Sequence, residues 1–183
     1  MTGVFTCFYP FLFKMRKVRL MSPKDALKLG IGMSDFIINA YIGDLADADL
    51  LIRPVPGMNH IAWQLGHLIS AERGFVEMVS PGSCPPLPEG FDAAHSKETA
   101  QVDDPAKFLP LAKYQELWKA QRAATLAVLD GYPEADLDKT DPEKYPPFAP
   151  TVAALLSMSG THALMHCGQF VAVRRQLGKP VTI

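Results

Sequence analysis

The chain has 183 residues, of which 48% are hydrophobic and 20% charged, and its formal net charge at pH 7 is −1. This length fits one domain with its own core, the composition excludes general disorder, and 18 Lys and Arg against 19 Asp and Glu exclude a broadly basic surface for nucleic acid. The three scattered cysteines predict no disulfide framework and fit a reducing cytoplasm.

The first 21 residues are expected to lie outside the folded domain. Residues 4–13 form an apolar run that is too short to cross a bilayer, which takes about 20 apolar residues. The basic residues follow this run, whereas in a secretory signal they precede it. Residues 1–21 are therefore either an apolar arm that packs on the body or on a partner, or an over-extended start. Residues 22–183 form the predicted single domain.

The first predicted helix covers about residues 23–45, with Ser22 as its N-cap and Pro23 as its first residue. A connection rich in proline ends it, and a second helix is predicted over about residues 60–79 with Asn59 as its cap. Both helices carry apolar stripes at helical spacing. The stripes are Leu27, Ile31, Ser34, Ile38 and Leu45 in the first helix, and Ile61, Leu65, Leu68, Phe75 and Val79 in the second.

Residues 81–105 have no clear period and predict a long connection, of the kind that often forms a lid or a mobile segment. A third helix is predicted over about residues 106–129. A fourth covers about residues 151–177 and ends before Gly178 and Pro180. Since no segment is typical of a strand, the sequence predicts an all-α four-helix bundle with long connections. The stripes are Leu111, Tyr114, Trp118, Thr125 and Val128 in the third helix, and Val152, Leu155, Ser159, His162, His166, Gln169 and Val173 in the fourth.

Two of the five histidines, His162 and His166, lie four residues apart on the stripe of the fourth helix. This spacing puts both rings on the inner face, where two neutral imidazoles can bind one divalent ion. His67 on the second helix can supply a third ligand, which would leave a position open for water or substrate, as in catalytic sites. No glutamate lies inside the pair to act as a metalloprotease base. In the alternative, these are core histidines hydrogen-bonded to each other or to Ser159 and Gln169.

Two further histidines and two cysteines are weaker candidates for a functional role. His60 either supports a ligand, lies at the surface near the helix cap, or competes as a ligand. His95 lies in the long connection and is expected to be solvated, and Cys84 is expected to be an exposed loop thiol. Cys167 follows His166 on another side of the helix and is expected to be a buried, inert thiol.

Other polar residues near the predicted stripes are candidates for supporting roles. Gln169 lies near the face of His162, where it either binds a metal-bound water or substrate or orients a ligand. Glu72 is a candidate base or ligand partner. Arg174 and Arg175 either bind an anionic substrate or form salt bridges, which are commoner.

The sequence resembles the DinB/YfiT-like family of metalloenzymes at two runs, NHIAWQLGHL at 59–68 and GTHALMHCGQF at 160–170. The ending RRQLGKP at 174–180 also matches, so the resemblance covers about residues 22–183. It implies an up-up-down-down four-helix bundle that is often dimeric. It also implies one divalent ion, nickel or zinc, held by three histidines, which by position are His67, His162 and His166.

The same resemblance implies transfers and isomerisations that use low-molecular-weight thiols. The favoured hypothesis is a cytoplasmic, metal-dependent S-transferase that acts on small electrophiles, without a nucleic-acid or membrane partner. The alternatives are a metal-dependent hydrolase and a non-catalytic module that binds metal or a small ligand in a stress or regulatory role. A homodimer is expected because Phe36 and Ile37 place apolar surface outside the first stripe.

Overall fold

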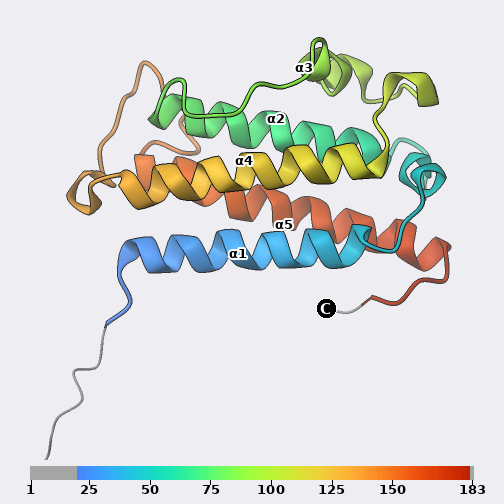
Figure 1. Ribbon diagram of the computed structural model, residues 1–183, viewed down its shortest axis with the longest axis horizontal. Helices are drawn as coiled ribbons and strands as arrows, with labels where there is room; N and C mark the ends of the chain where they lie inside the picture. The colour runs from blue at the N-terminus through green and yellow to red at the C-terminus, as the bar shows by residue number, and fades with distance from the viewer. Residues whose placement is uncertain (1–19, 182–183) are drawn as a thin grey trace, which may run out of the picture.

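A computed structural model describes residues 20–181 and shows four long helices side by side (Figure 1). No strand occurs among these described residues, so the predicted all-α bundle is confirmed. None of the helices in this part of the chain is long and apolar enough to span a membrane. The long helices are α1 (Pro23–Ile42), α2 (Ile61–Val79), α4 (Leu111–Gly131) and α5 (Val152–Gln176), and the connection between α2 and α4 contains the short helix α3 (Phe91–Ala94).

Local capping signals account for the helix starts. Ser22 caps α1, because its Oγ accepts a hydrogen bond from the Asp25 N–H at 3.1 Å while the Asp25 carboxylate accepts one from the Ser22 N–H at 3.1 Å. The predicted cap of α2 is wrong by one residue. His60, not Asn59, caps this helix, and its ring Nδ1 accepts from the Trp63 N–H at 3.1 Å.

The start of α4 also differs from the prediction, at Leu111 instead of residue 106. Pro105–Lys107 forms a separate 3-10 turn, and Pro110 stands directly before the helix. The Asp47 carboxylate accepts a hydrogen bond from the Leu111 N–H at 2.7 Å. A residue 64 positions earlier therefore satisfies one of the unpaired donors of this helix start.

Taken along the chain, α1, α2, α4 and α5 run up, down, down and up (Figure 1). Lys24 near the start of α1 donates to the Asp130 carbonyl near the end of α4, at 2.9 Å, so these helices are antiparallel. Arg174 near the end of α5 donates to the Tyr41 carbonyl near the end of α1, at 2.6 Å, so these two are parallel. Taken around the bundle in the order α1, α5, α2, α4, the directions are up, up, down, down (Figure 1). The implied up-up-down-down arrangement thus describes the order in space and not the order in the chain.

The connection from α2 to α4 lies over α2 and holds more structure than its sequence predicts (Figure 1). Besides α3 it contains 3-10 turns at Lys97–Thr99 and Pro105–Lys107. Two expectations of exposure are wrong here: the side chain of His95 is buried and that of Cys84 is half-buried. The segment is therefore a packed layer on α2.

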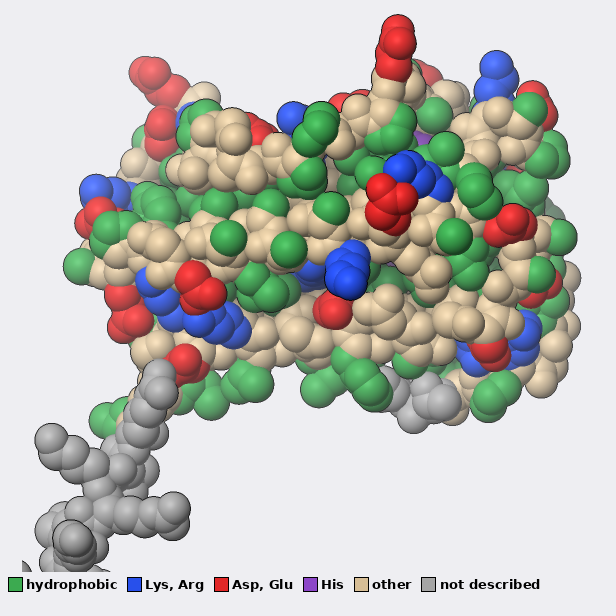
Figure 2. Space-filling view, in the orientation of Figure 1, with side chains coloured by type: hydrophobic (Ala, Val, Ile, Leu, Met, Phe, Trp, Pro, Cys, Tyr) green, Lys and Arg blue, Asp and Glu red, His purple; other side chains and the backbone are tan. Residues whose placement is uncertain are grey.

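One apolar strip remains on the outside of the bundle. Figure 2 shows hydrophobic side chains along the lower edge of the molecule, where α1 lies. Leu29, Met33 and Phe36 of α1 are each more than half exposed, whereas Ile37, expected to be exposed with Phe36, belongs to the core. The predicted N-terminal arm falls almost wholly within residues 1–19, outside the described residues.

Candidate metal centre

Three histidines from two antiparallel helices meet at one place in the bundle. His67 comes from α2, and His162 and His166 come from α5. The ring centroids lie 5.2 Å apart for His67 and His162, 5.4 Å for His67 and His166, and 4.9 Å for His162 and His166. One ligand nitrogen from each ring lies within 4.8 Å of the other two. The residues predicted as a ligand set are therefore brought together, with His166 buried and the other two half-buried.

A hydrogen bond fixes the tautomer of His166. Its Nδ1 lies 2.8 Å from Oε1 of Gln64, a buried side chain on α2. The amide is oriented by its own Nε2, which donates to the Asn59 carbonyl at 2.5 Å. Because an amide oxygen only accepts, Nδ1 carries the proton and Nε2 of His166 keeps its lone pair. An oriented imidazole with its second nitrogen unprotonated has the form that a metal ion requires.

The other two rings are positioned by aromatic contacts. Trp63 stacks on His67 with ring centroids 4.8 Å apart and an interplanar angle of 8°, and Phe75 meets His162 edge-on at 6.4 Å and 74°. Within residues 20–181, no hydrogen bond engages the ring nitrogens of His67 or His162. Their lone pairs are therefore available to a ligand, which argues against the alternative that these are satisfied core histidines.

Burial keeps the three imidazoles neutral. Loss of solvation, with a smaller contribution from the neighbouring histidine rings, lowers the pKa of His166 to about 3 and that of His162 to about 4. The pKa of His67 is lowered for the same reason, with a smaller contribution from the positive charge of Lys97. Neutral imidazole is the form that donates a lone pair to a metal ion.

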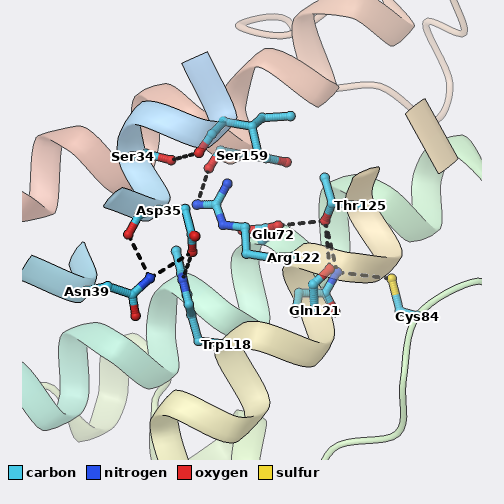
Figure 3. A network of polar contacts seen from close by, with 11 residues as sticks. Ser34, Asp35, Asn39, Glu72, Cys84, Trp118, Gln121, Arg122, Thr125 and Ser159 are labelled. Carbon is cyan, nitrogen blue, oxygen red and sulfur yellow. Dashed lines mark hydrogen bonds and ion pairs between the residues drawn. The ribbon is translucent and has the colours of Figure 1, made fainter. Parts of the chain in front are cut away.

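Figure 3 shows a buried ion pair between α2 and α4. Oε2 of Glu72 on α2 is 3.2 Å from Nε of Arg122 on α4, and both side chains are almost wholly buried. Thr125 Oγ1 lies 2.6 Å from the other Glu72 oxygen, and Arg122 donates to the Ser159 carbonyl at 2.7 Å. Glu72 and His162 line one small hollow. Glu72 is therefore not part of the three-histidine cluster. Its ion pair with Arg122 connects α2 to α4.

Two remaining histidines are fully engaged elsewhere. His60 is buried at the start of α2, where Nδ1 accepts from Trp63 and Nε2 donates to the Val102 carbonyl at 3.0 Å. It therefore does not lie at the surface and has no nitrogen left for a metal. His95, expected to be solvated, donates from Nδ1 to the Phe91 carbonyl at 2.7 Å and accepts at Nε2 from the Tyr114 hydroxyl at 2.7 Å.

Neither described cysteine has the environment of a reactive thiolate. Cys84, expected to be exposed, accepts a weak hydrogen bond from Gln121 Nε2 at 3.3 Å and donates to the Arg73 carbonyl at 3.8 Å. Burial raises the pKa of its thiol. Cys167 is buried as expected, and burial raises its pKa to about 12.

Of the polar residues near the end of α5, one has a clear structural role. Arg174 is buried and holds the exposed Asp44 carboxylate through Nη1 at 2.5 Å and Nη2 at 3.2 Å, so it acts as a structural tie. Arg175 is exposed, and Gln169 is half-buried. The role of Gln169 stays a prediction.

Sequence reasoning missed Gln64 and Trp63. They stand three and four residues before His67, so helical spacing alone places them on the same side of α2. That spacing was the available signal. The partner of Gln64, however, lies 102 positions away in the chain.

Comparison with known proteins supports the family that the motifs resemble. The family model described as the DinB superfamily matches residues 38–170, which is most of the chain and includes all three clustered histidines. No curated protein and no solved structure matches the chain. The match and the all-α bundle lead to one conclusion: the chain belongs to the DinB superfamily.

Proposed function

We propose that His67, His162 and His166 bind one divalent metal ion, nickel or zinc, and that the protein is a metal-dependent enzyme. The observation that carries this proposal is the convergence of three neutral imidazoles whose ligand atoms lie within 4.8 Å of one another. The donor set fits such an ion, since imidazole nitrogen suits zinc and nickel and the Gln64 contact leaves a lone pair on His166.

The chain supplies three neutral ligands and no carboxylate among them. A divalent ion held in this way keeps its full positive charge and favours the ionised form of a thiol or water that binds beside it. The rings of His67 and His162 are half-buried, whereas that of His166 is buried and hydrogen-bonded to Gln64. Three protein ligands leave at least one coordination position of the ion for an external ligand.

The reaction that we propose is transfer of a low-molecular-weight thiol to a small electrophile. The thiol loses its proton, its sulfur bonds to the electrophilic carbon, and the leaving group departs with the electron pair of the broken bond. The family membership and the open ligand set support this chemistry. A cytoplasmic setting, with its high concentration of reduced thiols, is part of the same proposal.

Cobalt substitution tests whether an external thiol reaches the site. Titration of the cobalt-loaded protein with a small thiol is expected to produce a sulfur-to-cobalt charge-transfer band. Gln169→Ala should leave the band in place, because the proposal does not use Gln169 as a ligand. A cobalt spectrum unchanged by any thiol or other anion at millimolar concentration would show a closed site and contradict the enzyme proposal.

We also propose a homodimer that covers the exposed strip of α1. Leu29, Met33 and Phe36 are more than half exposed and lie on one side of this helix. Sedimentation equilibrium should give twice the chain mass of 20.1 kDa, and a single 20.1 kDa species across the micromolar range would reject the dimer.

A further inference from the structure

The ring of His67 is held differently from that of its partner His166. His166 is oriented by the hydrogen bond that its Nδ1 donates to Gln64 Oε1, but no described residue makes a hydrogen bond with the ring of His67. The ring of Trp63, one helical turn earlier, stacks on it almost in parallel, with the two ring centroids 4.8 Å apart. A parallel stack fixes the plane of the imidazole and leaves both edge nitrogens uncovered. Stacking is therefore the contact that sets the orientation of His67.

Trp63 is in turn fixed by the connection that lies over α2. Its side chain is 4% exposed, and its indole Nε1 donates to the Ser96 carbonyl at 3.0 Å. Two turns along the helix from Trp63, Ser70 Oγ donates to the Asp92 carboxylate at 2.6 Å. The segment 92–96 thus runs along the side of α2 that carries Trp63.

His95 locks this segment in place between those two contacts. Its ring fills the space above Gly66, where an added Cβ would lie 2.1 Å from the imidazole Cδ2. Both ring nitrogens are used, one by the Phe91 carbonyl and the other by the Tyr114 hydroxyl. The ring can neither rotate nor withdraw without losing buried hydrogen bonds, so the position of Ser96 is well determined.

We infer that Trp63 is the positioning residue of His67, and that segment 92–96 of the α2–α4 connection holds Trp63 in place and thereby shapes the metal site. This inference rests on the proposed function, because it requires a metal at His67. The chain of contacts runs from Tyr114 on α4 through His95 and Ser96 to Trp63, and its last contact is the stack on His67.

Nickel affinity of folded variants tests the inference. Trp63→Leu removes the planar ring and should weaken nickel binding by about tenfold or more, the usual effect of losing a group that orients a ligand. Trp63→Phe keeps a stacking ring and should restore binding to within about threefold of the original protein. Trp118→Leu is the matched control, since it truncates another buried tryptophan, on α4, and should leave nickel affinity unchanged.

Tryptophan fluorescence gives a second readout because the chain contains only two tryptophans. In Trp118→Phe, all emission comes from Trp63, and bound nickel should quench most of it through the stacked His67. In Trp63→Phe, all emission comes from Trp118, and quenching should be small.

The outcomes separate this inference from the proposal on which it rests. Unchanged nickel affinity in Trp63→Leu, with nickel bound stoichiometrically, would overturn the positioning role and leave the metal site intact. Absence of nickel binding in the original protein would overturn the proposed function and the inference together. If Trp63→Leu does not fold, Trp63→Met is compared with Trp63→Phe, and equal affinities of the two would contradict the role of the aromatic ring.

Discussion

Replacing Glu72 by Ala should lower the free energy of unfolding at pH 8 by about 3–5 kcal/mol. The reason is the charge left behind on Arg122, which is 4% exposed and lies 4.2 Å from the centre of the Trp118 ring. Burial raises the pKa of Glu72 to about 7 although Arg122 and Thr125 act in the opposite direction, so the carboxylate is ionised and paired at pH 8. Without it, Arg122 has no salt-bridge partner among the described residues, and the Asp35 carboxylate acts on it only through its charge.

Urea unfolding monitored by circular dichroism measures this loss. Asp136→Ala is the matched control, because it breaks an exposed pair with Lys139 and should cost less than about 1 kcal/mol. A similar small cost for Glu72→Ala would show that Arg122 finds another partner or water in the folded protein. It would contradict the account of the pair as a buried tie between α2 and α4.

Metal affinity should change by less than about tenfold between pH 7 and pH 5. An imidazole with the ordinary pKa of about 6.5 is mostly protonated at pH 5, so two such ligands would together weaken binding by about a thousandfold. In this site the pKa values of His162 and His166 are about 4 and about 3. Both values lie below pH 5, so protons do not compete for these two nitrogens until the solution is more acidic.

Competition titration with a chelator of known pH dependence gives the affinity at each pH. The pKa of His67 is lowered by burial as well, so this third ligand should add less pH dependence than an ordinary histidine would. A thousandfold loss of affinity by pH 5 would mean that the histidines are solvated in the metal-free protein, contrary to the burial of His166.

The sequence was sufficient to predict the features of the fold that depend on local signals. Apolar spacing gave four helices, and the Ser22 cap and the stop at Gly178 are confirmed. The predicted start of the third helix near residue 106 is wrong for two reasons. Pro105 begins a separate turn, and Asp47, far away in the chain, supports the observed start of α4 at Leu111. Helix boundaries that depend on distant partners leave no local signal.

The candidate site shows the same division. The spacing of His162 and His166 and a third histidine on a facing helix were readable from the sequence, and the structure brings all three together. Their support was not readable, because Gln64 meets His166 across 102 positions. The burial of His95 is not readable from the sequence for a similar reason. A polar residue in a connection is ordinarily solvated, and the space above Gly66 and the Tyr114 hydroxyl, which favour its burial, come from other parts of the chain.

The metal content of the purified protein tests the central claim most directly. Protein prepared without an affinity tag and loaded with nickel or zinc should contain one metal ion per chain by elemental analysis. The single variants His67→Ala, His162→Ala and His166→Ala should each lose most of that metal after dialysis, whereas His60→Ala, which removes an engaged histidine outside the cluster, should retain it in the folded protein. Stoichiometric metal in any of the three site variants, or its absence from the original protein, would contradict the assignment of this site.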